Sequence, residues 1–196
     1  MRIETKRLML RNYKETDIDD YFEYVSQPDV GPRCGWQPYT SKDEAMKRLL
    51  LEASKPYQFA IVLKESNKVI GSVEIMNLKD NSKYPFLDSI EGVKEIGCLI
   101  NQDYWNNGYM TEALEVIIAT CFEVLDYKAL VASYFEPNGG SGRVQEKCGF
   151  KTMGKLKDYI TWYLTNEPCD LVINLLTQKD YNKNKTNKEI VITKED

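Results

Sequence analysis

The feature that most constrains the fold is a turn between a short apolar run and a long amphipathic helix. Residues 93–101 (VKEIGCLIN) have the pattern of a β-strand, and an Asn-Asn-Gly turn follows at residues 106–108. Apolar side chains then recur at helical spacing: Met110, Ala113, Leu114, Ile117, Ile118, Cys121, Phe122 and Leu125. The sequence therefore predicts a strand, a glycine turn and a helix in direct succession.

The N-terminal end of such a helix is suited to binding an anion. Its first N–H groups lack helical acceptors, the helix dipole places roughly half a positive charge there, and a glycine lets a ligand approach the backbone closely. Phosphate is the natural ligand for this arrangement. The alternative is a plain connecting turn whose N–H groups bind water. Residues 104–111 match neither the GxxxxGK[ST] nor the GxGxxG phosphate-binding motif.

Composition excludes several kinds of chemistry. The chain of 196 residues has no histidine, which removes Ser-His-Asp and Cys-His catalysis and HExxH metal sites. The five cysteines are scattered without CxxC spacing, so we expect free thiols in a reducing cytoplasm and no metal site. A net charge of −4 argues against a nucleic-acid partner. No apolar run approaches the ~20 residues of a membrane span, and the charged start does not read as a secretory signal.

The remaining pattern predicts one α+β domain over residues 1–177, with a mixed sheet and helices on both faces. Predicted strands cover residues 7–13, 57–63, 68–78, 93–101, 128–135, 151–160 and 169–177. Predicted helices cover residues 14–26, capped by Thr16 or Asp17; 41–54, with a capping box of Ser41 and Glu44; and 141–150, ending at Gly149.

The other segments are predicted to be irregular. Residues 31–40 and 79–90 are expected to be loops. The polar tail 178–196 is expected to be partly disordered, with an edge strand at residues 189–193. The glycines of residues 139–142 predict a loose or delayed first turn for the helix that follows.

Three stretches carry a resemblance to a known family. EIGCLINQDYWNNGYMTEALEVIIATCFEVL (95–125), followed by PNGGSGRVQEKCGF (137–150), resembles the GCN5-related N-acetyltransferases (GNAT). The start, IETKRLMLRNYKETDIDDYFEY (3–24), resembles the opening of the RimJ/RimL-type subgroup, where TxRLxLR leads into a helix. The resemblance spans about residues 1–176. It implies a mostly antiparallel mixed sheet in which strand 93–101 splays away from strand 128–135.

The resemblance also implies a function. It predicts an acetyl-CoA-dependent N-acetyltransferase that moves an acetyl group to a primary amine, either a protein N-terminus or a small molecule, by direct attack in a ternary complex. The rival is a CoA-binding module with little catalysis, and it is favoured by Gln145, Met110 and the glycine-rich residues 139–142. Relatives are frequently dimers, so a homodimer is a further expectation.

By the same resemblance, the backbone from Asn106 to Thr111 binds the pyrophosphate of the coenzyme. An exposed N–H near Leu99 or Ile100 would polarise the thioester carbonyl, while the strand pairs with the pantetheine arm. Met110 departs from the family pattern and is expected to pack inward. The predicted coenzyme-binding residues are Leu99, Ile100, Trp105, Asn106, Asn107, Gly108, Tyr109, Met110, Thr111, Asn138 and Ser141. Arg143 and Lys147 either reach the 3′-phosphate or form a solvated basic face.

Catalytic roles fall to Glu95 and Ser141. Acetyl transfer needs a neutral amine, donors for the oxyanion and a donor for the leaving thiolate. Glu95 is the expected general base, with Glu74 as its rival and a purely structural strand residue as the alternative. Ser141 either stabilises the thiolate or caps its helix.

The acid and the acceptor site are less defined. Many family members carry a tyrosine acid where this chain has Gln145, which has no ionisable proton. Tyr134 and Tyr109 are further candidate donors. The loop of residues 31–40 is expected to border the acceptor site, together with residues 79–90. Trp36 and Tyr39 are expected to line an amine pocket there, or else only to pin this loop.

Overall fold

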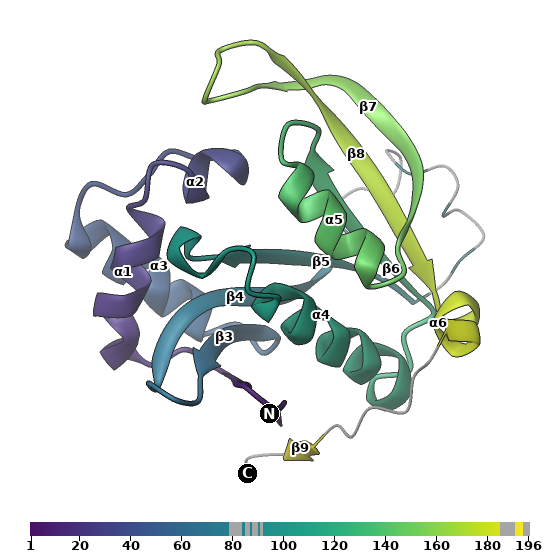
Figure 1. Cartoon of the computed structure of the whole chain (residues 1–196), viewed down its shortest axis with the longest axis horizontal. Helices are drawn as coiled ribbons and strands as arrows, with labels where there is room; N and C mark the ends of the chain where they lie inside the picture. Colours follow the sequence, from purple (N-terminus) through teal and green to yellow (C-terminus); the bar gives the residue numbers. More distant parts are fainter. Residues whose placement is uncertain (79–83, 85–86, 88–89, 91, 185–190, 194–196) are drawn as a thin grey trace.

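The computed structural model describes residues 1–78, 84, 87, 90, 92–184 and 191–193, and within them nine strands form one sheet (Figure 1). The strand order is β7-β8-β6-β5-β4-β3-β2-β1-β9. The strands are β1 (Arg2–Glu4), β2 (Leu8–Arg11), β3 (Gln58–Leu63), β4 (Lys68–Asn77), β5 (Val93–Ile100), β6 (Ala129–Phe135), β7 (Lys151–Thr161), β8 (Pro168–Thr177) and β9 (Val191–Thr193). Neighbours pair antiparallel except β5 and β6, which are parallel.

Helices cover both faces of the sheet, as the sequence predicts. They are α1 (Ile18–Val25), α2 (Val30–Arg33), α3 (Lys42–Ala53), α4 (Tyr109–Ala119), α5 (Gly139–Lys147) and α6 (Gln178–Asn184). Strand β3 is buried on both sides because its side chains alternate between two cores. Ile61 packs in the core that contains Leu114 and Ile117 of α4, whereas Val62 packs in the core that contains Leu49 of α3.

Strands β5 and β6 diverge in the middle of the sheet. They pair over Val93–Glu95 and Ala129–Val131. Beyond Glu95, β5 stays paired with β4 as far as Ile100, and β6 stays paired with β8 as far as Phe135. The α+β fold with a mostly antiparallel mixed sheet and a splayed strand pair is therefore confirmed.

The N-terminal part of the chain differs from the sequence analysis in two places. Strand β1 was not predicted, because three residues are too short to show an alternating pattern. Residues 31–40 were predicted to be a loop, yet α2 covers Val30–Arg33. Pro32 is tolerated there because the first turn of a helix does not use its N–H groups. Gly31 lies under Trp36, whose ring a Cβ atom would meet at 2.6 Å.

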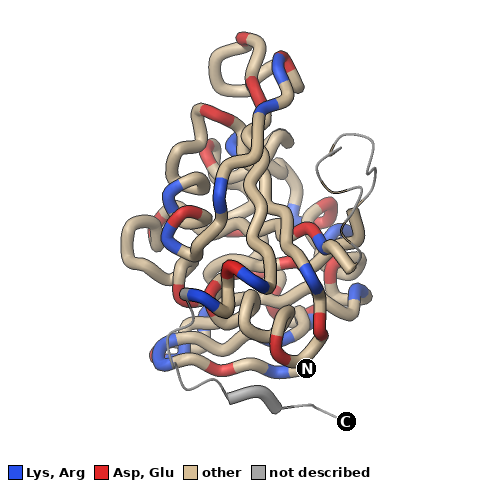
Figure 2. Tube along the Cα trace, turned by 90° about the vertical axis from the view of Figure 1, so that its right-hand side faces the viewer, with Lys and Arg blue, Asp and Glu red and all other residues tan. Residues whose placement is uncertain are grey.

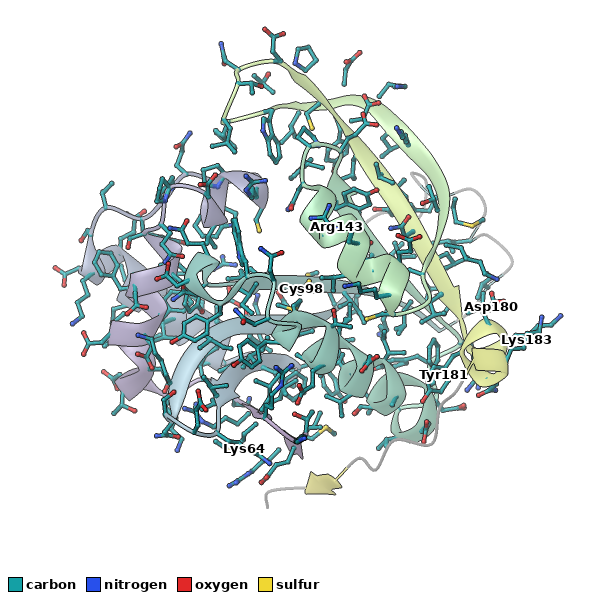
Figure 3. All side chains as sticks on the ribbon, in the orientation of Figure 1. Lys64, Cys98, Arg143, Asp180, Tyr181 and Lys183 are labelled. Carbon is teal, nitrogen blue, oxygen red and sulfur yellow. The ribbon has the colours of Figure 1, made fainter. Side chains whose placement is uncertain are left out.

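The first part of the C-terminal tail forms a helix that the sequence did not predict. Residues Gln178–Asn184 form helix α6 directly after β8. Figure 3 shows Tyr181 on this helix, and its ring packs 5.1 Å from that of Phe122. An apolar contact with the core explains why this part of a polar tail is ordered. The expected edge strand is also present, because β9 pairs antiparallel with β1.

The predicted helix caps differ in detail. Ser41 occupies the N-cap position of α3, but its side chain makes no capping hydrogen bond, so the predicted capping box does not form. Asp17 precedes α1 without capping it, because its carboxylate accepts hydrogen bonds of 2.7 and 2.9 Å from Arg11. The helical run predicted through Leu125 is α4 followed by a π-helical turn, Thr120–Val124.

Helix α5 begins at Gly139, so the loose or delayed first turn predicted there is also wrong. The side chain of Asn138 caps it by accepting a hydrogen bond from the Ser141 N–H. Gly142 is needed for close packing, because a Cβ atom there would lie 2.7 Å from the ring of Tyr134. Asn138, and not Ser141, is therefore the capping residue.

Acidic and basic residues are interspersed along the chain trace in Figure 2. In the described part of the chain, no helix combines the length and apolar character needed to cross a bilayer. The predicted loop 79–90 lies mostly outside the described residues.

Candidate active site

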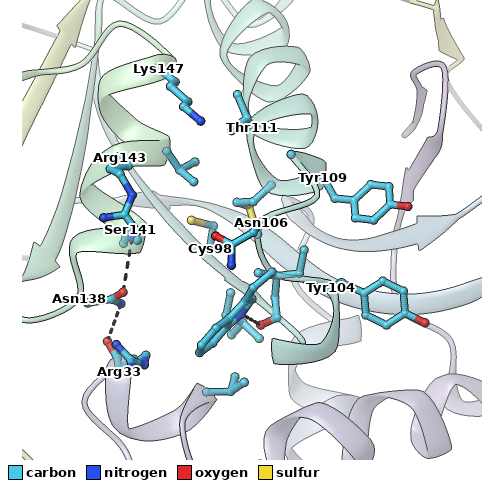
Figure 4. Close-up of a pocket in the computed structure, with 18 of the residues that line it drawn as sticks. Arg33, Cys98, Tyr104, Asn106, Tyr109, Thr111, Asn138, Ser141, Arg143 and Lys147 are labelled. Carbon is cyan, nitrogen blue, oxygen red and sulfur yellow. Dashed lines mark hydrogen bonds between the residues drawn. The ribbon is translucent and has the colours of Figure 1, made fainter.

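A cavity of about 260 Å³ opens where β5 and β6 diverge, between the N-terminal ends of α4 and α5 (Figure 4). Every predicted coenzyme-binding residue except Asn107 lines it: Leu99, Ile100, Trp105, Asn106, Gly108, Tyr109, Met110, Thr111, Asn138 and Ser141. We call this the coenzyme cavity, after the ligand that the sequence resemblance predicts for these residues. The Asn107 side chain instead donates a hydrogen bond to the Trp105 carbonyl.

The turn ahead of α4 leaves backbone N–H groups without acceptors among the described residues. Gly108 is the N-cap residue of α4, and a glycine has no side chain with which to cap the helix. The first helical bond at this end runs from the Glu112 N–H to the Gly108 carbonyl, so the N–H groups of Tyr109, Met110 and Thr111 precede the helical ladder. Both Asn106 (φ 61°) and Gly108 (φ 77°) adopt the left-handed conformation that turns the chain here.

Arg7 supports this turn from behind. Its guanidinium donates to the Asn107 carbonyl at 3.0 Å and to the Glu112 carboxylate at 2.6 Å, and it lies 4.3 Å over the ring of Tyr109. Glu112 also accepts a hydrogen bond from the Thr5 hydroxyl. The TxRL stretch of the sequence thus fixes the start of α4, a role that the sequence alone did not reveal.

The charge around the coenzyme cavity is one-sided. Its described lining contains Arg33, Arg143 and Lys147 but no Asp or Glu, although the chain as a whole carries a net charge of −4. Figure 4 shows Arg143 and Lys147 extending from α5 on the side opposite Thr111. Cations combined with free N–H groups at a helix N-terminus suit a phosphate-bearing ligand. Met110 is buried under the helix, as predicted.

The open edge of β5 can be assigned from its hydrogen-bond register. The Asn101 N–H donates to the Ile70 carbonyl of the β4 side, so the alternation of a strand turns the N–H groups of Asn101 and Leu99 toward β4. Those of Cys98 and Ile100 point toward the splay. Of the two predicted donors, Ile100 therefore has the required direction and Leu99 does not. The Ile100 carbonyl already accepts a hydrogen bond from the Trp105 indole.

A second cavity, of about 640 Å³, adjoins the first. It is called the acceptor cavity, because it contains Trp36 and Tyr39, which the sequence analysis expects at an acceptor site. It shares a border with the coenzyme cavity, formed by Arg33, Cys34, Cys98, Leu99, Asn138 and Ser141. Glu95 lines the acceptor cavity and is the last β5 residue that pairs with β6, opposite Val131. It therefore stands at the point where the splay begins, on the same strand face as Gly97 and Leu99.

Glu74, the rival base, is committed to an ion-pair network. Lys55 bridges Glu74 at 2.8 Å and the buried Glu52 at 2.9 Å, and Arg48 also pairs with Glu52. Trp36 and Tyr39 line the acceptor cavity and also pack on each other, with ring centroids 5.6 Å apart. Both of the readings open for these aromatics therefore have structural support.

The hydroxyl group of the half-buried Ser141 contacts a buried pair of side-chain amides, those of Gln145 and Asn174. The side-chain Nε2 of Gln145 donates a hydrogen bond of 3.1 Å to the Ser141 Oγ. The side-chain Oε1 of Gln145 accepts a hydrogen bond of 2.8 Å from the side chain of Asn174 in β8. Gln145 is 2% exposed, so it is not a surface replacement for the family tyrosine. Tyr134 lines the acceptor cavity, whereas Tyr109 lies beneath the Arg7 guanidinium.

Arg33 and Cys34 lie in the segment predicted to border the acceptor site, but sequence reasoning did not single them out. Arg33 lies 5.4 Å from the Trp105 ring, and its carbonyl accepts a hydrogen bond from Asn138. Burial raises the pKa of the Cys98 thiol to about 11, and burial, with the neighbouring Cys98, raises that of Cys34 to about 12. All five cysteines are free, as predicted. Among the described residues, no cluster of three or more His, Cys, Asp or Glu could hold a metal.

Fold and site together define an acyl-transfer enzyme of a known class. The sequence profile of the acetyltransferase (GNAT) domain matches residues 7–151, and the chain belongs to this family. It is 28% identical over 160 residues to the uncharacterized N-acetyltransferase p20 of Bacillus licheniformis, a match that covers 79% of this chain and 85% of p20. The protein is thus an acetyltransferase with N-acetyltransferase relatives.

Solved structures share the fold. A GNAT-family acetyltransferase from Bacillus anthracis superposes with a TM-score of 0.78 at 23% identity, covering 91% of this chain and 99% of that one. Spermidine N-acetyltransferase from Vibrio cholerae, solved with CoA and spermine, gives a TM-score of 0.72 at 17% identity, covering 91% and 99%. At these identities the likeness concerns the fold alone.

Proposed function

We propose that the protein transfers the acetyl group of acetyl-CoA to a primary amine by direct attack in a ternary complex. The observation that carries this proposal is the shared border of the two cavities. One cavity offers N–H groups and three cations to a phosphate-bearing ligand, and the other places a carboxylate at the start of the splay. A donor and an acceptor bound in the two cavities would meet at that border.

The residues present fit the coenzyme. The N–H groups of Tyr109, Met110 and Thr111 would hold its diphosphate, with Arg143 and Lys147 as partners for further phosphate charge. Acetyl-CoA supplies a thioester carbonyl that an amine can attack. The N–H of Ile100 would bind that carbonyl oxygen, because it points into the splay.

Glu95 would accept the proton of the acceptor amine. An α-amine, with a pKa near 8, needs only a modest base, whereas a lysine amine, near 10.4, needs a stronger one. A carboxylate at the start of the splay, in the acceptor cavity, suits the first kind of acceptor better, and a protein N-terminus fits that description.

Direct transfer is favoured over an acetyl-cysteine route. Cys34 and Cys98 both line the shared border, yet burial raises the pKa of each thiol well above neutral. A protonated thiol is a poor nucleophile, because the thiolate is the reactive form. These cysteines therefore serve as apolar lining.

We also assign the chain to the RimJ/RimL-type subgroup. The contacts of Thr5 and Arg7 with Glu112 give the subgroup's TxRL opening a physical purpose, since they hold the phosphate-binding turn. Two arguments for the rival interpretation, a CoA-binding module, no longer apply. Met110 packs inward, and residues 139–142 begin a regular helix.

Thiol release from acetyl-CoA tests the proposal. The acceptor panel should contain a peptide with a free N-terminus, the same peptide blocked at its N-terminus but carrying a lysine, and spermidine. We expect thiol release with the free N-terminus or the small amine, together with acetylated product. Tight binding of CoA without thiol release for any acceptor would favour the binding module instead.

A further inference from the structure

A buried row of amide side chains leads from the sheet to the cavity border. Asn174, in the middle of β8, is 4% exposed and lies opposite Ala132 of β6 and Thr152 of β7. Its Nδ2 donates to the Gln145 Oε1 at 2.8 Å, and the Gln145 Nε2 donates to the Ser141 Oγ at 3.1 Å. Ser141 lines both cavities, so this row ends where they meet.

The row fixes the direction of the Ser141 hydroxyl. A serine hydroxyl has one hydrogen and two lone pairs. Gln145 fills one lone pair as a donor, so the hydroxyl hydrogen must point away from Gln145. Among the described residues, Ser141 Oγ accepts this bond and donates none. Its hydrogen is therefore available to a ligand at the cavity border.

The geometry of Gln145 leaves little freedom for another arrangement. Its Nε2 also lies 3.4 Å from the Ser133 carbonyl, and its Oε1 is held by Asn174. With the oxygen occupied by a donor, the amide cannot turn round to accept the Ser141 hydrogen without breaking both contacts. Asn174 thus determines which end of Gln145 faces the serine.

Asn174 makes this contact at a cost to the fold. Its Oδ1 is buried and has no hydrogen-bond partner among the described atoms. An unsatisfied buried acceptor destabilises a protein, and an apolar side chain of the same shape would remove the penalty. Leu176, two positions along on the same face of the strand, and the opposing Ala132 belong to an apolar core. A polar residue that lowers the stability of the fold at this position points to a functional requirement.

We propose that Gln145 and Asn174 are positioning residues that aim the Ser141 hydroxyl hydrogen at the cavity border, where it donates a hydrogen bond to the sulfur of bound coenzyme A. This proposal rests on the proposed function and assigns a role to the glutamine that stands in place of the family tyrosine. The tyrosine would supply a proton; the relay supplies a directed hydrogen bond to the thiolate. A hydrogen bond to the thiolate favours this charged form, and it therefore lowers the pKa of the coenzyme thiol.

The thiol pKa of bound coenzyme A is the direct readout. It is followed by the ultraviolet absorbance of the thiolate across pH, with protein plus desulfo-coenzyme A as the reference that subtracts the protein's own thiols. In the wild-type protein we expect a pKa about one unit below the ~8.5 of an ordinary thiol. Ser141→Ala and Gln145→Met should return it to that of free coenzyme A, and Asn174→Leu should shift it in the same direction.

Three comparisons between variants distinguish a positioning role of Gln145 and Asn174 from a purely structural one. Asn174→Leu should keep or raise the melting temperature while it raises the thiol pKa, since it removes the unsatisfied Oδ1. The double variant Ser141→Ala/Gln145→Met should equal Ser141→Ala alone, because Gln145 acts through Ser141. Glu146→Gln, an exposed change on the same helix, should leave the thiol pKa unaltered.

The outcomes distinguish this inference from the proposed function. If coenzyme A binds but its thiol pKa is the same in the wild type and all variants, the relay is wrong and the function stands. A further shift from Gln145→Met in the Ser141→Ala background would also overturn the relay. If calorimetry detects no binding of coenzyme A, both proposals fail.

Discussion

The guanidinium group of Arg7 donates a 2.6 Å hydrogen bond to the carboxylate of Glu112, and the same group holds the Asn107 carbonyl. A residue next to the second strand thereby fixes the turn and the first turn of the helix that offer N–H groups to the coenzyme cavity. Pre-organised donors bind an anion better than mobile ones, because less ordering is needed on binding.

Arg7→Ala should weaken coenzyme A binding while leaving the fold intact. We expect a Kd about tenfold higher, equivalent to about 1.4 kcal/mol, because the turn loses its support. Isothermal titration calorimetry measures it. Arg2→Ala is the matched control, since Arg2 pairs only with nearby Glu4 among the contacts described. Equal Kd values for wild type and Arg7→Ala would contradict this role.

Glu112 gives the stability a pH dependence. Burial raises the pKa of its carboxyl group, but hydrogen bonds from Thr5 and Arg7 outweigh this, so the pKa lies below its ordinary value. Such a group stabilises the fold above its ordinary pKa and loses that effect as the pH falls through the folded value. Urea unfolding should show Glu112→Gln less stable than wild type at neutral pH, with the gap closing in acid. A gap independent of pH would show that the charge of Glu112 is irrelevant.

Gly108 is required by its backbone conformation. A Cβ atom there would make an ordinary 3.6 Å contact with Arg7, but φ is +77°. Gly108→Ala should therefore destabilise the protein by about 1 kcal/mol and Gly108→Val by more, and both should weaken coenzyme A binding. Gly154→Ala, where a Cβ atom would meet nothing within 4 Å, is the control. Micromolar coenzyme affinity retained in Gly108→Val would refute the assignment of the turn to phosphate.

Glu95→Gln should lower the rate of thiol release by about 10²-fold near neutral pH, the usual worth of a general base. The loss should shrink at high pH, where the acceptor amine deprotonates unaided. Glu74→Gln, which alters a carboxylate already paired with Lys55, should have a smaller effect. A pH–rate profile that is unchanged by Glu95→Gln would remove Glu95 from this role.

The α+β fold could be predicted from the sequence because its helices and strands depend on local patterns, whereas the splayed strand pair was implied by the family resemblance. The spacing from Met110 to Leu125 and the Asn-Asn-Gly turn placed the helix and its N-terminal end correctly. Helix α2 was missed because Gly31 and Pro32 signal a loop, and the close packing of Trp36 on Gly31 cannot be seen in the sequence. Helix α6 is polar in sequence, and its order depends on a distant contact with Phe122.

The relay from Asn174 was hidden for a similar reason. Gln145 and Asn174 lie on different elements, and nothing in their spacing indicates that they meet. Arg7 and Glu112 are likewise 105 positions apart. The roles of Glu95 and Ser141, the acceptor and the homodimer stay predictions.

A crystal structure with coenzyme A bound tests the central claim most directly. The account predicts the diphosphate within hydrogen-bond distance of the backbone N–H groups of Tyr109, Met110 and Thr111. A nucleotide bound elsewhere, or water alone at this helix N-terminus, would contradict it.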